Sequence, residues 1–211
     1  MDHSDRVTSG EEVGIDVKVD GYIVEPLTPD RFDDLVTVLG VGGIGGCWCM
    51  YWTAPTTAAW GEGTKGGRKA PNRKALLDII EAGPSPGLLA YLDEEPVAWC
   101  RVVPRFSLPG LANSRFFKTD LDIDGVWSLP CFVVRRSHRH RGLTTILTKA
   151  AIEYARDNGG RILEAYPWDT DEIKSESTIY TGLASTFERL GFEVVQRKAP
   201  HKPMMRLTVN E

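Results

Sequence analysis

The spacing of apolar residues along the chain predicts four helices. The first places its apolar residues at i, i+3, i+4 and i+7 over residues 32–39, and the second covers 72–82 before Gly83 and Pro84. A helix over 177–190 is predicted by the same spacing near the end of the chain. The longest continuous apolar face belongs to a helix that begins at Leu143, and its members are Leu143, Ile146, Leu147, Ala150, Ala151, Tyr154 and Ala155.

Short runs of branched and aromatic residues predict strands between these helices. The predicted strands cover residues 22–26, 87–92, 97–103, 126–134, 161–166, 192–196 and 204–209. The second and third of them form a hairpin around residues 93–96. Because strands and helices follow one another along the whole chain, the pattern indicates a mixed α/β domain.

Length and composition limit the number of domains and the class of protein. The 211 residues are enough for one well-packed domain and too few for two ordinary ones. Hydrophobic residues make up 42% and charged residues 26%, which excludes a wholly disordered chain. Residues 1–18 are polar and acidic without periodicity, so we expect a flexible tail followed by a single domain over 19–211.

Charge and cysteine content suggest where the protein works. The net charge of −4 argues against binding of nucleic acid by bulk electrostatics. Four cysteines are too few for a disulfide scaffold, and the first residues lack a basic and apolar signal, so we expect a cytoplasmic protein with reduced thiols. Residues 35–61 carry no charge and are long enough to span a bilayer, but their many glycines favour a buried or cleft-lining segment over a membrane helix.

A basic segment lies between the predicted strand 126–134 and the helix that begins at Leu143. Four arginines and two histidines occur within residues 135–141 of a chain that is acidic as a whole. The first N–H groups of a helix have no partner within the helix and favour an anion, and Gly142 permits close approach of the backbone. The segment therefore predicts a phosphate-bearing ligand at Arg139–Thr144; a solvated basic loop is the alternative.

The same segment resembles a known family signature. Residues 139–144, Arg-His-Arg-Gly-Leu-Thr, are similar to the Gln/Arg-x-x-Gly-x-Gly/Ala signature of the GNAT superfamily of acetyl-CoA-dependent N-acetyltransferases. Phe187-Glu-Arg-Leu-Gly191-Phe192 is similar to the end of that family's domain, and the resemblance covers about residues 19–209. It implies a twisted central sheet of about six to seven strands with about four helices. Two parallel central strands, the ones that contain Val134 and Glu164, would splay apart.

The resemblance also implies a co-substrate and the residues that hold it. Acetyl-CoA would be the acetyl donor, with no metal. The predicted cofactor-binding residues contribute backbone amides to the pantetheine arm (Phe132, Val133 and Val134) and to the pyrophosphate (Arg139, His140, Arg141, Gly142, Leu143 and Thr144). Two positions depart from the family pattern: Thr144 replaces the usual Gly or Ala, and Phe187 stands where many members have a tyrosine that protonates the thiolate.

Acetyl transfer needs a neutral amine and a proton for the departing thiolate. The reaction therefore calls for a base that takes the proton of the amine and an acid that protonates the thiolate. Glu164, on the strand 161–166, is the candidate base, with a structural carboxylate as the alternative. Because Phe187 cannot donate a proton, Tyr180 or Tyr166 is the candidate acid, and plain packing of these tyrosines is the alternative. We expect direct attack by a primary amine of a small molecule or peptide, in a monomer or homodimer. A CoA-binding sensor or interaction module without catalysis is the alternative function.

The charge-free stretch carries half of the tryptophans. Trp48, Trp52 and Trp60 occur there with Tyr51, and such an aromatic wall suits an apolar or cationic amine. We therefore predict Trp48, Trp52 and Tyr166 as acceptor-binding residues, and a hydrophobic cluster under a long loop is the alternative.

Two further patterns in this stretch do not support a site. The glycines of residues 40–45 match a dinucleotide fingerprint but follow a helix where the fingerprint follows a strand. Cys47 and Cys49 lack a second close pair of metal ligands, so zinc is not expected.

Overall fold

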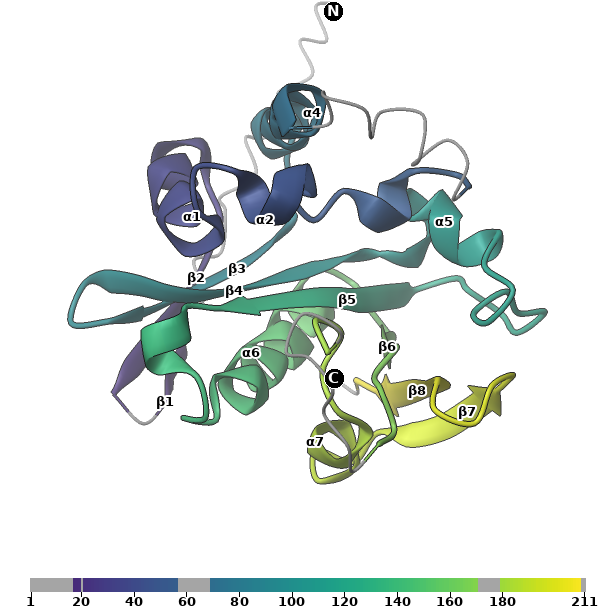
Figure 1. The fold of residues 1–211 in the computed structure, drawn as a ribbon. Coiled ribbons are helices and arrows are strands. Elements are labelled where there is room, and N and C mark those ends of the chain that lie inside the picture. Colours follow the sequence, from purple (N-terminus) through teal and green to yellow (C-terminus); the bar gives the residue numbers. More distant parts are fainter. Residues whose placement is uncertain (1–16, 20, 57–68, 171–178, 210–211) are drawn as a thin grey trace, which may run out of the picture.

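The strands of the chain join one eight-stranded sheet in a computed structural model that describes residues 17–19, 21–56, 69–170 and 179–209. The sheet order is β1-β2-β3-β4-β5-β6-β8-β7 (Figure 1). The strands are β1 (Val17–Val19), β2 (Tyr22–Pro26), β3 (Gly87–Leu92), β4 (Glu95–Pro104), β5 (Val126–Val134), β6 (Ile162–Ala165), β7 (Glu193–Arg197) and β8 (Pro203–Thr208). The predicted mixed α/β class is confirmed, with at least one strand more than expected.

The described helices differ widely in length. Three of them exceed seven residues: α1 (Phe32–Leu39), α4 (Lys69–Ala82) and α6 (Leu143–Asp157). The short ones are α2 (Gly43–Gly46), α5 (Pro109–Ala112) and α7 (Ala184–Glu188), with single turns at η1 (Pro29–Arg31), η2 (Tyr51–Thr53), η3 (Arg105–Ser107) and η4 (Arg136–His138).

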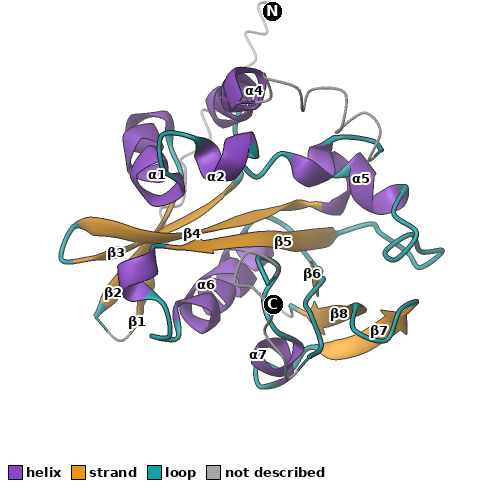
Figure 2. Cartoon of the chain, viewed as in Figure 1, coloured by secondary structure: helices purple, strands orange, loops and turns teal. Residues whose placement is uncertain are grey.

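The described helices cover both faces of the sheet (Figures 1 and 2). α6 and α7 lie on one side, where the core includes Leu88, Leu129 and Leu147. α1, α2, α4 and α5 lie on the opposite side, where Leu35 and Trp99 are fully buried. The two faces of α6 explain its place, because its apolar stripe packs on the sheet while Lys149 on the same helix is exposed.

The predicted helix over 177–190 is wrong in its extent. Within it the structure has only α7, and residues 177 and 178 lie outside the described part of the chain. Gly182 has a φ of +84, a left-handed conformation, and Leu183 is extended at φ −106 and ψ 141, so a helix begins only after them. Tyr180 therefore lies in an irregular segment and not two helical turns from Phe187.

The N-terminal boundary also lies earlier than predicted. β1 pairs with β2 in antiparallel register, so the ordered sheet starts inside the stretch assigned to a tail. Residues 1–16 lie outside the described residues, and the tail stays a prediction for them.

The charge-free stretch packs partly into the core. Trp48, Cys49 and Met50 are buried there, while Trp60 lies outside the described residues. Within the described ranges no single helix has the length and apolar character needed to cross a membrane. The segments Pro29–Leu39 and Gly43–Thr53 have the required length and apolar character only when they are counted as one, and a bend of 103° separates them.

The parallel pair at the centre of the sheet opens a gap. β5 and β6 pair from Val126 with Ile162 to Leu129 with Ala165. β6 ends there, whereas β5 continues to Val134 along β4. The two strands therefore diverge, and this edge of β5 beyond Leu129 has no β6 partner. The predicted splay between two parallel strands is confirmed.

Gly87 supports this sheet by letting β3 approach β4 closely. A Cβ at Gly87 would lie 2.2 Å from the carbonyl oxygen of Cys100 and 2.4 Å from the ring of Trp99. We expect Gly87→Ala to lower the free energy of unfolding by about 1–3 kcal/mol, because the strands must shift to admit the methyl group. Urea unfolding measures this change.

Gly42→Ala is the matched control, because Gly42 has a φ of −94 and nothing within 4 Å of a Cβ. We expect it to unfold at nearly the wild-type urea concentration. Equal stability of the two variants would contradict close packing at Gly87.

Candidate functional site

The basic segment forms a turn between β5 and the N-terminus of α6. After η4, His140 has a φ of +61 and Gly142 a φ of +76, so the chain turns twice through left-handed conformations before the helix begins. A Cβ at Gly142 would meet nothing within 4 Å. The approach to the first amides of α6 is therefore open at this glycine, as binding of a phosphate there requires.

The arginines of this turn serve two different purposes. Arg135 forms an ion pair with Glu95 and donates to the carbonyl oxygen of Pro96 at 3.1 Å, and Arg139 Nε donates to the carbonyl oxygen of Val134 at 3.2 Å. These two side chains brace the turn against the sheet. Arg136 and Arg141 are exposed, and guanidinium groups next to a helix N-terminus suit a pyrophosphate.

The splayed edge of β5 presents alternate backbone amides. The N–H of Phe132 donates to the carbonyl oxygen of Tyr180 at 2.7 Å, across the gap, whereas the N–H of Arg135 donates to Val97 of β4 at 3.0 Å. Since amides alternate along a strand, the N–H of Val134 faces the gap and that of Val133 faces β4. The three amides predicted to hold pantetheine thus point in two directions, and one of these amides, that of Phe132, is already bonded to Tyr180.

A cavity of about 500 Å³ lies beside the end of β6. Seven of its 17 described lining residues are aromatic, and Asn113, Ser114, Arg115 and Lys202 add polar groups. The aromatic lining residues are Tyr51, Trp52, Phe116, Phe117, Tyr166, Trp168 and Tyr180. Trp52 and Tyr166, two of the three predicted acceptor residues, line it. Trp48 does not, because it is fully buried and stacks on Phe32 with ring centroids 6.0 Å apart.

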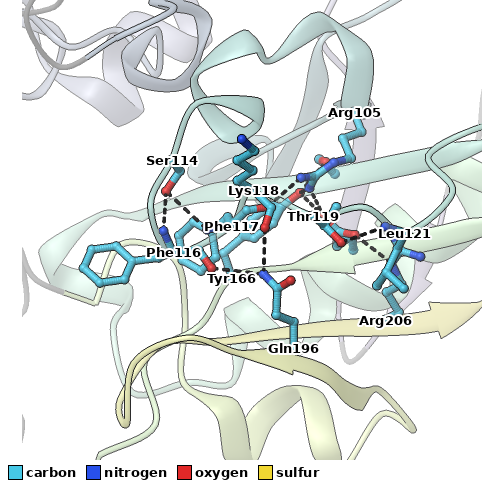
Figure 3. Close-up of polar contacts among 12 residues, drawn as sticks. Arg105, Ser114, Phe116, Phe117, Lys118, Thr119, Leu121, Tyr166, Gln196 and Arg206 are labelled. Atoms are coloured by element: carbon cyan, nitrogen blue, oxygen red, sulfur yellow. Dashed lines mark hydrogen bonds and ion pairs between the residues drawn. The ribbon is translucent and has the colours of Figure 1, made fainter.

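The segment between α5 and β5, whose polar contacts Figure 3 shows, contributes lining residues to one side of this cavity. Ser114 Oγ accepts from the N–H groups of Phe116 and Phe117 at 3.2 and 3.3 Å. Gln196 Nε2, from β7, donates to the carbonyl oxygens of Phe116 and Lys118 at 3.1 and 3.2 Å. These bonds hold an irregular segment against the sheet, so the aromatic wall has a defined position.

Glu164 lies next to the cavity wall in a buried polar network. Its side chain has no exposed surface and forms ion pairs with Arg105 and, at 2.7 Å, with Arg206. The hydroxyl of Tyr166 donates to Glu164 at 2.6 Å and accepts from Arg105 at 2.7 Å, and Ser128 shares a hydrogen bond with it at 2.7 Å. Tyr166 thus connects the cavity wall to the carboxylate. The role of Glu164 as base stays a prediction.

Burial affects Tyr166 and Tyr180, two of the tyrosines that line the cavity. It raises the pKa of Tyr180 above the ordinary value, with nearby Cys131 and Tyr51 acting in the same direction. It also raises the pKa of Tyr166, against the opposing effect of Arg105. Both hydroxyls therefore keep their protons at neutral pH. Phe187 is fully buried between Phe132 and Phe192, at centroid distances of 6.1 and 5.2 Å, so it serves the core.

Sequence reasoning did not identify Arg105, Arg206 or Lys202. Arg105 follows the apolar run of β4, and Arg206 interrupts the apolar run of β8. A charged residue within such a run or directly at its end is the signal that could have identified both, because buried charges occur almost only with partners. Lys202 carries no comparable signal, since it lies in a polar turn.

Comparison with known proteins agrees with these features. A family model described as the acetyltransferase (GNAT) family matches residues 51–174, more than half of the chain. No curated protein matches the sequence.

Solved structures show the same fold at low sequence identity. One is an N-acetyltransferase from Staphylococcus aureus Mu50, with 12% identity, 90% of this chain and 99% of that chain covered, and a TM-score of 0.53. A second is a polyamine N-acetyltransferase from Drosophila melanogaster, an enzyme that forms N-acetylagmatine, with 14% identity, coverage of 89% and 99%, and a TM-score of 0.53. A third is yncA, a putative acetyltransferase from Salmonella typhimurium with acetyl-CoA bound, with 13% identity, coverage of 91% and 96%, and a TM-score of 0.50.

Proposed function

Because the chain belongs to the GNAT family of acetyltransferases, we propose that it moves the acetyl group of acetyl-CoA to a primary amine by direct attack. One observation carries the proposal. The open edge of β5 connects the phosphate-suited turn at the N-terminus of α6 with the aromatic cavity, through Phe132 and the adjoining Tyr180. A long co-substrate with its phosphates at the turn would therefore bring its thioester to an acceptor in the cavity.

The residues of the turn and the strand would bind acetyl-CoA. The amides of Arg139, His140, Arg141, Gly142, Leu143 and Thr144 would surround the pyrophosphate at the positive end of the helix dipole. The N–H of Val134 faces the gap and would pair with pantetheine. The N–H of Phe132 becomes available to it when the bond to Tyr180 opens.

In the reaction, the nitrogen lone pair of the neutral amine forms a bond to the thioester carbon. The carbon–sulfur bond breaks, and the thiolate of CoA leaves and takes up a proton. Glu164 is the proposed base and would receive the amine proton by way of Tyr166, whose hydroxyl bonds to it. Tyr180 is the proposed acid because it lines the cavity in its protonated form. Each step is general acid–base catalysis at a positioned group.

A CoA-binding sensor without catalysis is the second candidate. The buried Phe187 favours it, because this side chain can neither donate a proton nor leave the core.

Turnover with a panel of primary amines tests the proposal. We expect CoA thiol and acetylated amine to appear in equal amounts, without a burst of CoA in the absence of amine. A burst that matches the enzyme concentration would indicate an acetyl-enzyme and contradict direct attack. Tight binding of CoA with no acetyl transfer to any amine of the panel would support the sensor.

A further inference from the structure

Two cations of the protein lie against the aromatic wall of the cavity. Arg115 stacks over the ring of Phe116, with its guanidinium carbon 4.4 Å from the centroid. Lys202 Nζ lies 4.5 Å from the centroid of Phe116 and 4.6 Å from that of Trp168. All four residues line the cavity. These ring faces therefore already hold positive charge, and cation–π attraction there is satisfied by the protein itself.

The described wall of the cavity contains no carboxylate to balance these cations. Next to this wall, Glu164 is paired with both Arg105 and Arg206, and Asp169 is paired with Arg197 at 2.7 Å. Burial lowers the pKa of Lys202, and the charge of Arg115 lowers it further. The described groups around the cavity are thus positive in sum, although the chain carries a net charge of −4.

This charge selects among amines in two ways. A polycationic acceptor meets like charge at the wall, whereas an acceptor with an anionic group meets Lys202 and Arg115. Nearby positive charge also lowers the pKa of an ammonium group, which increases the share of neutral amine that can attack the thioester. Aromatic side chains and a cavity of about 500 Å³ leave space for a small apolar body between these groups.

We propose, on the basis of the proposed function, that the acceptor is an amine that also bears a carboxylate and an apolar side chain, as in an aromatic amino acid. The carboxylate lies at Lys202 and Arg115, and the side chain packs among Trp52, Phe117 and Trp168. Polyamines are poor acceptors for this protein. Its substrate class thus differs from that of the Drosophila polyamine N-acetyltransferase.

Binding in the absence of acetyl-CoA tests the proposal separately from catalysis. The probes are 3-phenylpropionate and phenethylamine, which share the ring and differ in the sign of their charge. Quenching of tryptophan fluorescence reports binding, because Trp52 and Trp168 line the cavity. We expect the carboxylate to bind about tenfold more tightly, and Lys202→Met to weaken it about fivefold, the scale of a partly exposed ion pair. Lys149→Met, at an exposed position of α6, should leave both affinities unchanged.

The outcomes for binding and for catalysis can be told apart. Tighter binding of phenethylamine, or a Lys202→Met variant that binds the carboxylate as well as wild type does, would overturn the inference. Rates of acetyl transfer to phenylalanine and to phenethylamine then complete the test, with phenylalanine expected to be faster. Preferred carboxylate binding without any acetyl transfer would contradict the proposed function and leave the anion site in place.

A second observation concerns two thiols on the segment after α2 and on β5. Cys49 Sγ and Cys131 Sγ lie 3.1 Å apart, and the indole N–H of Trp99 donates to Cys49 Sγ at 3.3 Å. The two cysteines are 7% and 9% exposed, and both are free thiols. Cys131 directly precedes Phe132, the residue whose amide faces the splay. The pair therefore connects the segment after α2 with the open part of β5.

A buried guanidinium accompanies this pair. Arg101 of β4 is 2% exposed, and its Nη1 donates to the carbonyl oxygen of Cys49 and contacts Met50 Sδ at 3.5 Å. Among the described residues, no carboxylate forms an ion pair with Arg101 and its Nε has no hydrogen-bond partner. A buried charge without a counter-ion is costly, so this site favours an anion on the neighbouring sulfurs. The bonds from Cys131 and Trp99 and the charge of Arg101 lower the pKa of Cys49 despite its burial.

We infer that Cys49 and Cys131 form an oxidisable pair, with hydrogen peroxide as the oxidant. The Cys49 thiolate attacks a peroxide oxygen, the O–O bond breaks, and the released hydroxide becomes water with the proton of the medium. The sulfur of Cys131 then attacks the sulfur of the Cys49 sulfenic acid. The S–O bond breaks, and the hydroxide leaves as water with the Cys131 proton. In sum, two thiols and one peroxide give one disulfide and two waters.

Peptide mapping after peroxide treatment and alkylation tests this inference. We expect the mass of the protein to fall by two hydrogen atoms. A pair of peptides linked through Cys49 and Cys131 should then appear in the map. Cys131→Ser should abolish the link, and Cys100→Ser, a matched buried cysteine, should retain it. A link between Cys47 and Cys49 in wild type, or peroxide treatment that leaves all four thiols free, would overturn the assignment.

Discussion

Gly142→Glu abolishes detectable binding of CoA while the far-UV circular dichroism spectrum stays near that of the wild type. The added carboxylate lies at the turn that would hold the pyrophosphate, and like charges in contact cost several kcal/mol, so we expect a loss of at least about 100-fold in affinity. Space is not the obstacle in the free protein, because a Cβ at Gly142 meets nothing within 4 Å. Isothermal titration calorimetry with CoA measures the change.

Gly159→Glu is the control for this variant. Gly159 follows the C-terminus of the same helix, has a positive φ of +80, and also has nothing within 4 Å of a Cβ. The same backbone strain and the same charge are thus introduced at the other end of α6, and we expect wild-type affinity for CoA. If the two variants bind CoA with equal affinity, the phosphates of CoA do not bind at the turn that contains Gly142.

Glu164→Gln lowers turnover by about 10- to 1000-fold, the range of one positioned acid–base group, with little change in CoA affinity. It also lowers stability, because Arg105 and Arg206 lose the carboxylate between them. Removal of one partner from a buried ion pair costs about 3–5 kcal/mol, and the retained amide offsets part of this cost. Thermal unfolding and steady-state kinetics of the purified variant measure the two effects separately.

The pH profile separates a base from a positioning residue. As the pH rises toward about 10, the ordinary range of an amine pKa, the neutral share of the amine increases without help, so much of a defect due to a missing base is recovered there. A defect that stays constant from about pH 6 to pH 10 indicates that Glu164 positions Tyr166 instead. Tyr166→Phe removes the hydroxyl that bonds to Glu164 and serves as the matched comparison. Tyr180→Phe should have a smaller effect than Glu164→Gln.

Local patterns in the sequence determined the part of the fold that is proposed to hold the co-substrate. β5, the basic turn and α6 are contiguous over residues 126–157, and β5 has the predicted bounds while α6 begins at the predicted residue. Alternation, helical spacing and helix termini depend on residues a few positions apart. The features that suit this turn to an anion are local for the same reason, since charge, glycine and helix N-terminus follow one another directly.

The tertiary structure alone decided which distant residues meet. The residue pattern of its segment indicates that Glu164 lies on a buried strand. It does not indicate that Arg105 and Arg206 are the partners of Glu164. Trp48 and Trp52 look alike in sequence, and only packing buries the first on Phe32 and leaves the second at the cavity. α7 is short because Gly182, just before it, takes a left-handed conformation that ends any helix there. The spacing of apolar residues does not indicate this conformation.

The proposed acceptor cavity is likewise decided by the tertiary structure. Lys202 and Arg115 are far apart along the chain, and neither segment has a pattern that points to the other. Folding brings Lys202 onto Phe116, the next residue after Arg115. Cys49 and Cys131 likewise meet only because the segment after α2 packs against β5. The charge of a cavity wall depends on all the residues that the fold brings together there. The periodicity of the sequence gives information only on residues within one helix or strand. The sequence by itself therefore determined the basic turn proposed to bind the co-substrate, and the tertiary structure decided the charge and lining of the cavity proposed to bind the acceptor.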